Sequence, residues 1–162
     1  DALAAAGLHR VNVSLDTLDP ARYAAITRGG DLRAVLAGIR AAREAKLLPV
    51  KLNCVVERDA GEPDARAVAA FAREQGLDAR FIHRMDFASG SFSVVEGGRG
   101  GDCPRCNRLR LSANGMVRPC LFSDLGFSVR RLGAEQALRQ AVAHKPEAGG
   151  PCSSNWIRAV GG

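Results

Sequence analysis

The chain has 162 residues, 46% of them hydrophobic, and a formal net charge of +6. This composition is ordinary for a soluble globular protein, and the length allows one domain or a small domain with an appendage. No apolar run approaches the about 20 residues that a membrane span needs, and no signal peptide is visible, so we expect no membrane partner. Of the 23 basic residues, 20 are scattered arginines without interleaved aromatic residues, so we also expect no nucleic-acid partner.

The five cysteines are an odd number, and two of them form a C-x-x-C pair. This usage argues against the disulfide framework of a small secreted protein. A reducing compartment is the natural environment for such thiols. We therefore expect a cytoplasmic location.

The first half of the chain alternates helical and strand-like patterns. Residues 1–8 resemble the end of a helix that Gly7 terminates. Asp19 and Asp31 are expected N-cap residues, with Pro20 at the first position of its helix. The predicted strands cover 9–16, 50–57 and 79–86, and the predicted helices cover 20–26, 32–47 and 64–75.

This alternation predicts an α/β fold with a parallel sheet and right-handed crossovers. Three strands do not close a barrel, so residues 1–87 are either a piece of a larger α/β barrel or a small open sheet. In both cases functional groups are expected at the carboxyl ends of the strands.

Residues 88–101 are rich in glycine and are predicted to be a linker before a second module at 102–162. That module begins with CPRCNRLRLSANGMVRPC. Asn114-Gly115 between two strand-like runs predicts a hairpin, since both residues tolerate positive φ. A last helix is expected at 134–144, before the tail.

The predicted hairpin brings Cys120 near the pair Cys103 and Cys106, with Arg108 and Arg110 on one face of a strand. Three converging thiolates indicate a metal or iron–sulfur site with an anion-binding wall. Spacing alone leaves two alternatives open. Structural zinc would need a fourth ligand, for which Cys152 and His144 are the candidates, whereas an iron–sulfur cluster can leave one iron open.

These motifs resemble those of the GTP 3′,8-cyclases, radical S-adenosylmethionine (SAM) enzymes of molybdenum-cofactor biosynthesis. The family motif C-x-x-C-N-R-L-R, followed by a hairpin and C-L-F, is matched by CPRCNRLRLSANGMVRPCLF. RVNVSLDTLDP resembles the fourth barrel strand with the turn after it, PVKLNCVV the fifth strand and LDARFIHRMD the sixth. The terminal Gly161-Gly162 resembles the family's tail.

The resemblance implies a lyase, active on GTP, that forms 3′,8-cyclo-7,8-dihydroguanosine 5′-triphosphate by SAM-derived radical chemistry. It implies a partial barrel followed by a module that binds a second 4Fe–4S cluster, and a homodimer is a further expectation. The implied residues are Cys103, Cys106 and Cys120 for the cluster, Lys51, Arg108, Leu109 and Arg110 for GTP, and Ser14 and Met85 for SAM.

The chain also departs from the family pattern. The C-x-x-x-C-x-x-C motif of the first cluster is absent, so we expect this chain alone to be inactive. His83 and Asp86 replace the family's Glu and Pro, and only 17 residues separate Met85 from Cys103, a shortened connecting segment. Two alternatives therefore remain: another radical SAM enzyme with an auxiliary cluster, and a zinc-stabilised binding module.

Overall fold

The computed structural model describes residues 2–86, 89–90 and 92–152. The chain forms two compact units, one comprising Asp1–Arg84 with Val94–Arg99 and the other Met85–Ser93 with Gly100–Gly162. Each unit is described separately below.

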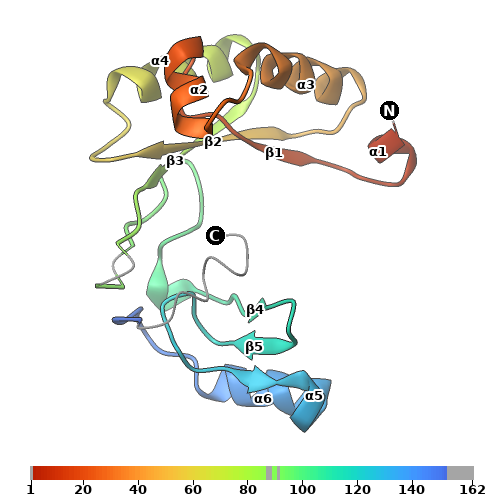
Figure 1. Cartoon of the computed structure of the whole chain (residues 1–162), viewed down its shortest axis with the longest axis vertical. Coiled ribbons are helices and arrows are strands. Elements are labelled where there is room, and N and C mark those ends of the chain that lie inside the picture. Colours follow the sequence, from red (N-terminus) through yellow and green to blue (C-terminus); the bar gives the residue numbers. More distant parts are fainter. Residues whose placement is uncertain (1, 87–88, 91, 153–162) are drawn as a thin grey trace. The chain divides into compact units, whose positions relative to one another are not determined.

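The first unit contains a parallel sheet of three strands in the order β1 (Val11–Ser14), β2 (Val50–Val56) and β3 (Asp78–His83). Helices α2 (Pro20–Thr27), α3 (Leu32–Glu44) and α4 (Pro63–Glu74) cover one face of this sheet (Figure 1), and the short α1 (Ala2–Ala5) precedes β1. The prediction of an α/β fold with a parallel sheet is confirmed.

The predicted N-caps are also confirmed. The Asp19 side chain accepts a 2.9 Å hydrogen bond from the backbone N–H of Arg22, and Asp31 accepts one of the same length from Arg33. Each carboxylate satisfies a backbone donor that has no partner within its own helix. Local sequence therefore decides where α2 and α3 begin.

Side chains along β2 alternate between the two faces of the sheet. Leu52 and Cys54 are buried against the helices, with 0% and 1% exposure. Lys51 and Asn53 point to the opposite face, as the two-residue period of a strand requires. That face consequently carries polar groups at the sheet centre.

Part of the predicted linker is structured. Glu96 forms an antiparallel bridge with Phe81, through two backbone hydrogen bonds of 3.0 and 3.1 Å. Val95 is 7% exposed, and the Nε2 atom of His83 lies 3.3 Å from Oε1 of Glu96. Val94–Arg99 thus packs on the outer edge of β3 as part of the first unit.

The second unit is a small antiparallel sheet with a helix packed on it. Val117 of this sheet contacts the fully buried Ala137 and Ala141 of α6, and these three residues are the centre of a second core. The elements are the 3-10 turn η1 (Cys103–Arg105), β4 (Arg110–Leu111), β5 (Met116–Arg118), β6 (Phe127–Ser128), α5 (Val129–Leu132) and α6 (Ala134–Ala143).

The hairpin predicted around Asn114-Gly115 is confirmed, and it joins β4 to β5. Only Gly115 has positive φ, at 80°, and its N–H donates a 2.9 Å hydrogen bond to the carbonyl of Ser112. Ser112 then pairs with Met116 around a three-residue loop. A type I turn followed by a left-handed glycine suits this length.

Candidate functional site

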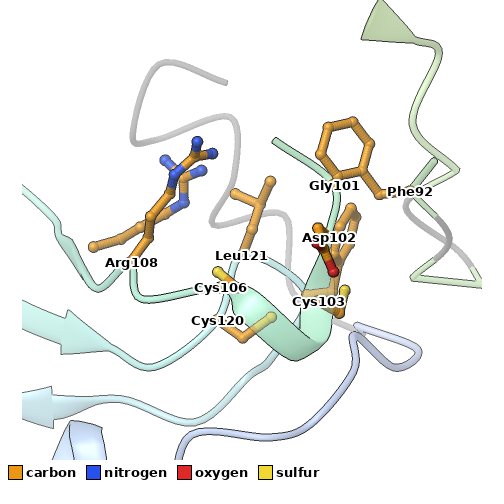
Figure 2. A pocket seen from close by; sticks show the side chains of 10 residues that line it. Phe92, Gly101, Asp102, Cys103, Cys106, Arg108, Cys120 and Leu121 are labelled. Carbon is orange, nitrogen blue, oxygen red and sulfur yellow. The ribbon is translucent and has the colours of Figure 1, made fainter. Parts of the chain in front are cut away.

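The second unit contains a pocket around the predicted cluster motif (Figure 2). Three cysteine side chains, two arginines and an apolar rim line it. The lining residues are Phe92, Gly101, Asp102, Cys103, Cys106, Arg108, Arg110, Cys120, Leu121 and Phe122.

Local structure explains why the three cysteines share one pocket. Cys103 begins η1, and the N–H of Cys106 donates a 3.0 Å hydrogen bond to the Cys103 carbonyl. This single tight turn brings both cysteines to the pocket. Cys120 arrives from the other arm of the hairpin, directly after β5 and the buried Pro119.

The cysteines are not packed around a single point. Across the described ranges 2–86, 89–90 and 92–152, no three His, Cys, Asp or Glu side chains are close enough to hold one metal ion. Zinc with Zn–S bonds of about 2.3 Å needs its sulfurs nearly in contact with one another. The thiolates of an iron–sulfur cluster bind different irons and stand further apart. Among the described residues, a preformed zinc site with its ligands in place is therefore absent.

The surroundings of Cys106 favour its thiolate form. Burial alone would raise its pKa, but the backbone N–H of Arg108 donates a hydrogen bond to its sulfur, and the charge and side-chain hydrogen bond of Lys145 favour the anion. The resulting pKa lies below the ordinary thiol value. Thiolate is the form that binds iron.

The two arginines and the leucine between them face opposite ways. Arg108 and Arg110 both line the pocket, whereas Leu109 packs against the second core. This is the alternation expected of an extended segment. The structure thus brings both guanidinium groups beside the cysteines and places the Leu109 side chain elsewhere.

Neither candidate for a fourth ligand lines the pocket. The thiol of Cys152 donates a 3.1 Å hydrogen bond to Oδ1 of Asp124. Nδ1 of His144 lies 2.9 Å from the carbonyl oxygen of Gln140, and its ring makes a tilted contact with that of Phe127. Asp102 is the additional carboxylate at the pocket, and it forms a 3.8 Å ion pair with Arg105.

The remaining predicted residues are distributed over both units. Ser14 is exposed at the end of β1, and Lys51 lies on the same sheet face, where its ammonium group is 3.3 Å from Asp78. Asn53, directly opposite Ser14 in the register, has a buried side-chain oxygen without a hydrogen-bond partner. Met85 is half-buried and belongs to the second unit.

Sequence reasoning missed three features of this site. Lys145 contacts the cysteine segments but lies 25 residues beyond Cys120, and no local pattern predicts that contact. Phe92 and Phe122 form the apolar rim with their ring centroids 6.3 Å apart. The Leu-Phe pair that follows Cys120 was a visible signal, whereas Phe92 lies in the segment interpreted as a linker.

Comparison with known proteins shows which proteins this chain is related to. The chain is 37% identical to a protein of Moorella thermoacetica named GTP 3′,8-cyclase, over 87% of this chain and 60% of that protein. The chain is homologous to the GTP 3′,8-cyclases. Further homologues with this name occur in Mycobacterium marinum (33% identity, 99% of this chain and 62% of the relative) and Listeria monocytogenes (30%, 91% and 60%).

The chain spans about three fifths of the length of these curated relatives. The match to the M. marinum GTP 3′,8-cyclase extends over 225 residues, more than the 162 residues of this chain, so the relative has additional residues inside the matched region. No family model and no solved structure matches the chain. The part of the chain that the structure describes contains no helix long and apolar enough to cross a membrane.

Proposed function

We propose that this chain supplies the GTP-binding and second-cluster part of a GTP 3′,8-cyclase, a radical SAM lyase of molybdenum-cofactor biosynthesis. The observation that carries the proposal is the pocket in which Cys103, Cys106 and Cys120 lie beside Arg108 and Arg110. The homology to the named cyclases supports the same conclusion.

In this proposal the three cysteines hold a 4Fe–4S cluster. Three thiolates leave one iron of such a cluster without a protein ligand, and that iron supplies a binding position for the substrate base. The lowered pKa of Cys106 supports ligation at this pocket, and the homology to the named cyclases supports a cluster over structural zinc.

Arg108 and Arg110 would bind the nucleotide. Guanidinium groups offer paired N–H donors that match phosphate and carbonyl acceptors, and they stay charged at all physiological pH values. Both line the cysteine pocket, so a nucleotide held by them would lie beside the cluster. Leu109 would contribute through its backbone, because its side chain is part of the second core.

The first unit would be a part of the radical SAM barrel. Its parallel strands carry polar side chains on the face without helices, as strands that line the inside of a barrel do. Lys51 would meet the GTP phosphates, in exchange for its present contact with Asp78, while Ser14 and Met85 would contact SAM.

Anaerobic reconstitution with iron and sulfide, followed by GTP binding, tests this proposal. We expect about four irons per chain, absorbance near ~400 nm and binding of GTP in preference to ATP. Arg108→Ala should weaken GTP binding by about tenfold or more, the loss of a charge-assisted contact. Arg131→Ala is the matched control, since Arg131 is exposed on α5 and does not line the pocket.

Each outcome has a defined meaning. Iron uptake without GTP binding would contradict the substrate assignment and favour another radical SAM enzyme with an auxiliary cluster. Stoichiometric zinc without iron would contradict the cluster. Equal weakening by Arg108→Ala and Arg131→Ala would show a general charge effect and not a site.

A further inference from the structure

Lys145 is placed so that one ammonium group contacts both segments that carry the cysteines. It comes after His144, the C-cap residue of α6, and is half-buried. Its Nζ atom donates hydrogen bonds of 2.8 Å to the backbone carbonyls of Arg108 and Pro119. Two good hydrogen bonds from one charged donor fix the position of that donor closely.

The two carbonyls lie next to two of the predicted cluster ligands. Arg108 is two residues after Cys106, and Pro119 immediately precedes Cys120. The backbone pairing of β4 with β5 reaches only to Arg110 opposite Arg118. In the part of the chain that the structure describes, the β4–β5 ladder does not continue beyond that pair, and Lys145 connects the two arms there.

The base of Lys145 is itself held firmly. Its backbone N–H donates a 3.1 Å hydrogen bond to the Val142 carbonyl at the end of α6. Ala137 and Ala141 anchor that helix on the second core with 0% exposure. The two hydrogen bonds from Lys145 to the carbonyls of Arg108 and Pro119, called the clamp below, therefore connect the core of the second unit to the cysteine segments.

Lys145 also places a positive charge at the pocket. Its ammonium group is 2.8 Å from the backbone oxygen of Arg108, a residue that lines the pocket, and 2.8 Å from that of Pro119, which precedes Cys120. The net charge around an iron–sulfur cluster and the hydrogen bonds to its sulfurs both set the reduction potential, and a nearby cation favours the reduced state.

We propose that Lys145 is a positioning residue of the cluster site, which holds the Cys106 and Cys120 segments at a fixed separation and makes the bound cluster easier to reduce. This inference rests on the proposed function, since it takes the cysteines to be cluster ligands. It assigns a role to a residue outside the C-x-x-C and hairpin motif.

Three substitutions separate the two effects of Lys145. Lys145→Met keeps an unbranched stem and removes both charge and donors, Lys145→Gln keeps an N–H donor without the charge, and Lys145→Arg keeps both. Lys46→Met is the matched control, because Lys46 is also a lysine just after a helix, α3, and is exposed. All are made in the full chain, reconstituted anaerobically with iron and sulfide.

The first readout is iron per chain, and the second is the midpoint potential, measured by titration with dithionite, which adds one electron to the cluster. We expect Lys145→Met to bind less iron than wild type, and Lys145→Arg to restore it. In the cluster that the Lys145→Gln variant still binds, the ratio of reduced to oxidised cluster at a set potential should fall about tenfold. This change corresponds to a midpoint potential lowered by about 59 mV for a one-electron couple. Lys46→Met should match wild type in both.

Wild-type iron content and potential in Lys145→Met and Lys145→Gln would overturn the inference. If Lys145→Met and Lys145→Gln both lose iron and Lys145→Arg keeps it, the positioning role is supported, although no cluster is then left in the first two variants for a potential measurement. If wild-type protein takes up no iron, the proposed function fails first. The clamp is then judged by hydrogen exchange of the cysteine segments, which Lys145→Met should accelerate and Lys46→Met should not.

Discussion

The hydroxyl of Thr17, which is 0% exposed, donates a 2.8 Å hydrogen bond to Oδ1 of Asp64, 47 positions further along the chain. The same hydroxyl accepts a 3.0 Å hydrogen bond from the N–H of Asp19. Thr17 therefore ties the loop after β1 both to the start of α2 and to α4. The loop belongs to the carboxyl edge of the sheet, where Ser14 ends β1.

We predict that Thr17→Val lowers the free energy of unfolding by about 1–3 kcal/mol, because two polar groups lose a partner at a buried position. Denaturant titration followed by circular dichroism measures the change. In the double variant with Asp64→Ala the two effects should be less than additive, since both substitutions remove the same hydrogen bond. Full additivity would show that the Thr17–Asp64 bond contributes nothing.

Gly115 gives a second prediction about stability, with an opposite change elsewhere as its control. Its φ of 80° is strained for alanine, although an added Cβ would meet only the Arg130 side chain at 3.6 Å or more. Gly115→Ala should lower the free energy of unfolding by about 1–2 kcal/mol. Gly38 lies inside α3 with open space around it, so Gly38→Ala should raise the free energy of unfolding by about 0.5–1 kcal/mol. Equal effects at the two sites would contradict the turn assignment.

Gly97 tests whether the segment at the edge of β3 is part of the fold. It has φ of 73°, and an added Cβ would lie 2.4 Å from the backbone oxygen of Ala79. We expect Gly97→Ala to displace Val94–Arg99 from the sheet edge. Hydrogen exchange at the Phe81 amide, which donates to the Glu96 carbonyl at 3.0 Å, should then accelerate strongly. Unchanged exchange at Phe81 would show that the bridge does not persist in solution.

Iron content distinguishes the cysteines of the pocket from the remaining ones. Serine in place of Cys103, Cys106 or Cys120 should reduce iron per chain after reconstitution, because each substitution removes a thiolate from the pocket. Cys152→Ser is the matched control and should retain wild-type iron, since Cys152 contacts Asp124 and not the pocket. Loss of iron in Cys152→Ser would make Cys152 a fourth ligand.

Thiol reactivity in metal-free protein gives a further contrast. Burial and then the nearby carboxylate of Asp16 raise the pKa of Cys54 to about 12, whereas the pKa of Cys106 is lowered. At pH 8 the thiolate fraction is therefore larger at Cys106, and thiolate is the form that reacts with iodoacetamide. Mass spectrometry should find Cys106 alkylated well before Cys54. The reverse order would contradict the environments described for both thiols.

Much of this architecture could be predicted because its causes are local in sequence. The capping carboxylates of Asp19 and Asp31 act within three residues of their own positions. The alternation along β2 follows from the two-residue period of a strand, which places Cys54 on the buried face. The C-x-x-C spacing places Cys103 and Cys106 on one turn without any help from the rest of the chain.

Other features depend on residues far apart in the chain, and only the tertiary structure could decide them. The bridge between Phe81 and Glu96 makes a segment that was predicted as a linker part of the first unit. It forms because the outer edge of β3 has backbone donors and acceptors that need partners. The glycine-rich sequence of the segment gives no sign of this pairing.

The sequence by itself determined the α/β order of the first unit, the hairpin and the three-cysteine motif with its neighbouring arginines. The tertiary structure decided how that motif is supported. Lys145 reaches carbonyls 26 and 37 positions away because α6 packs on the second core, and Cys152 pairs with Asp124 outside the pocket. Motif spacing is a local property of the chain. The position of the Lys145 ammonium group between two segments depends instead on how the preceding helix α6 is packed.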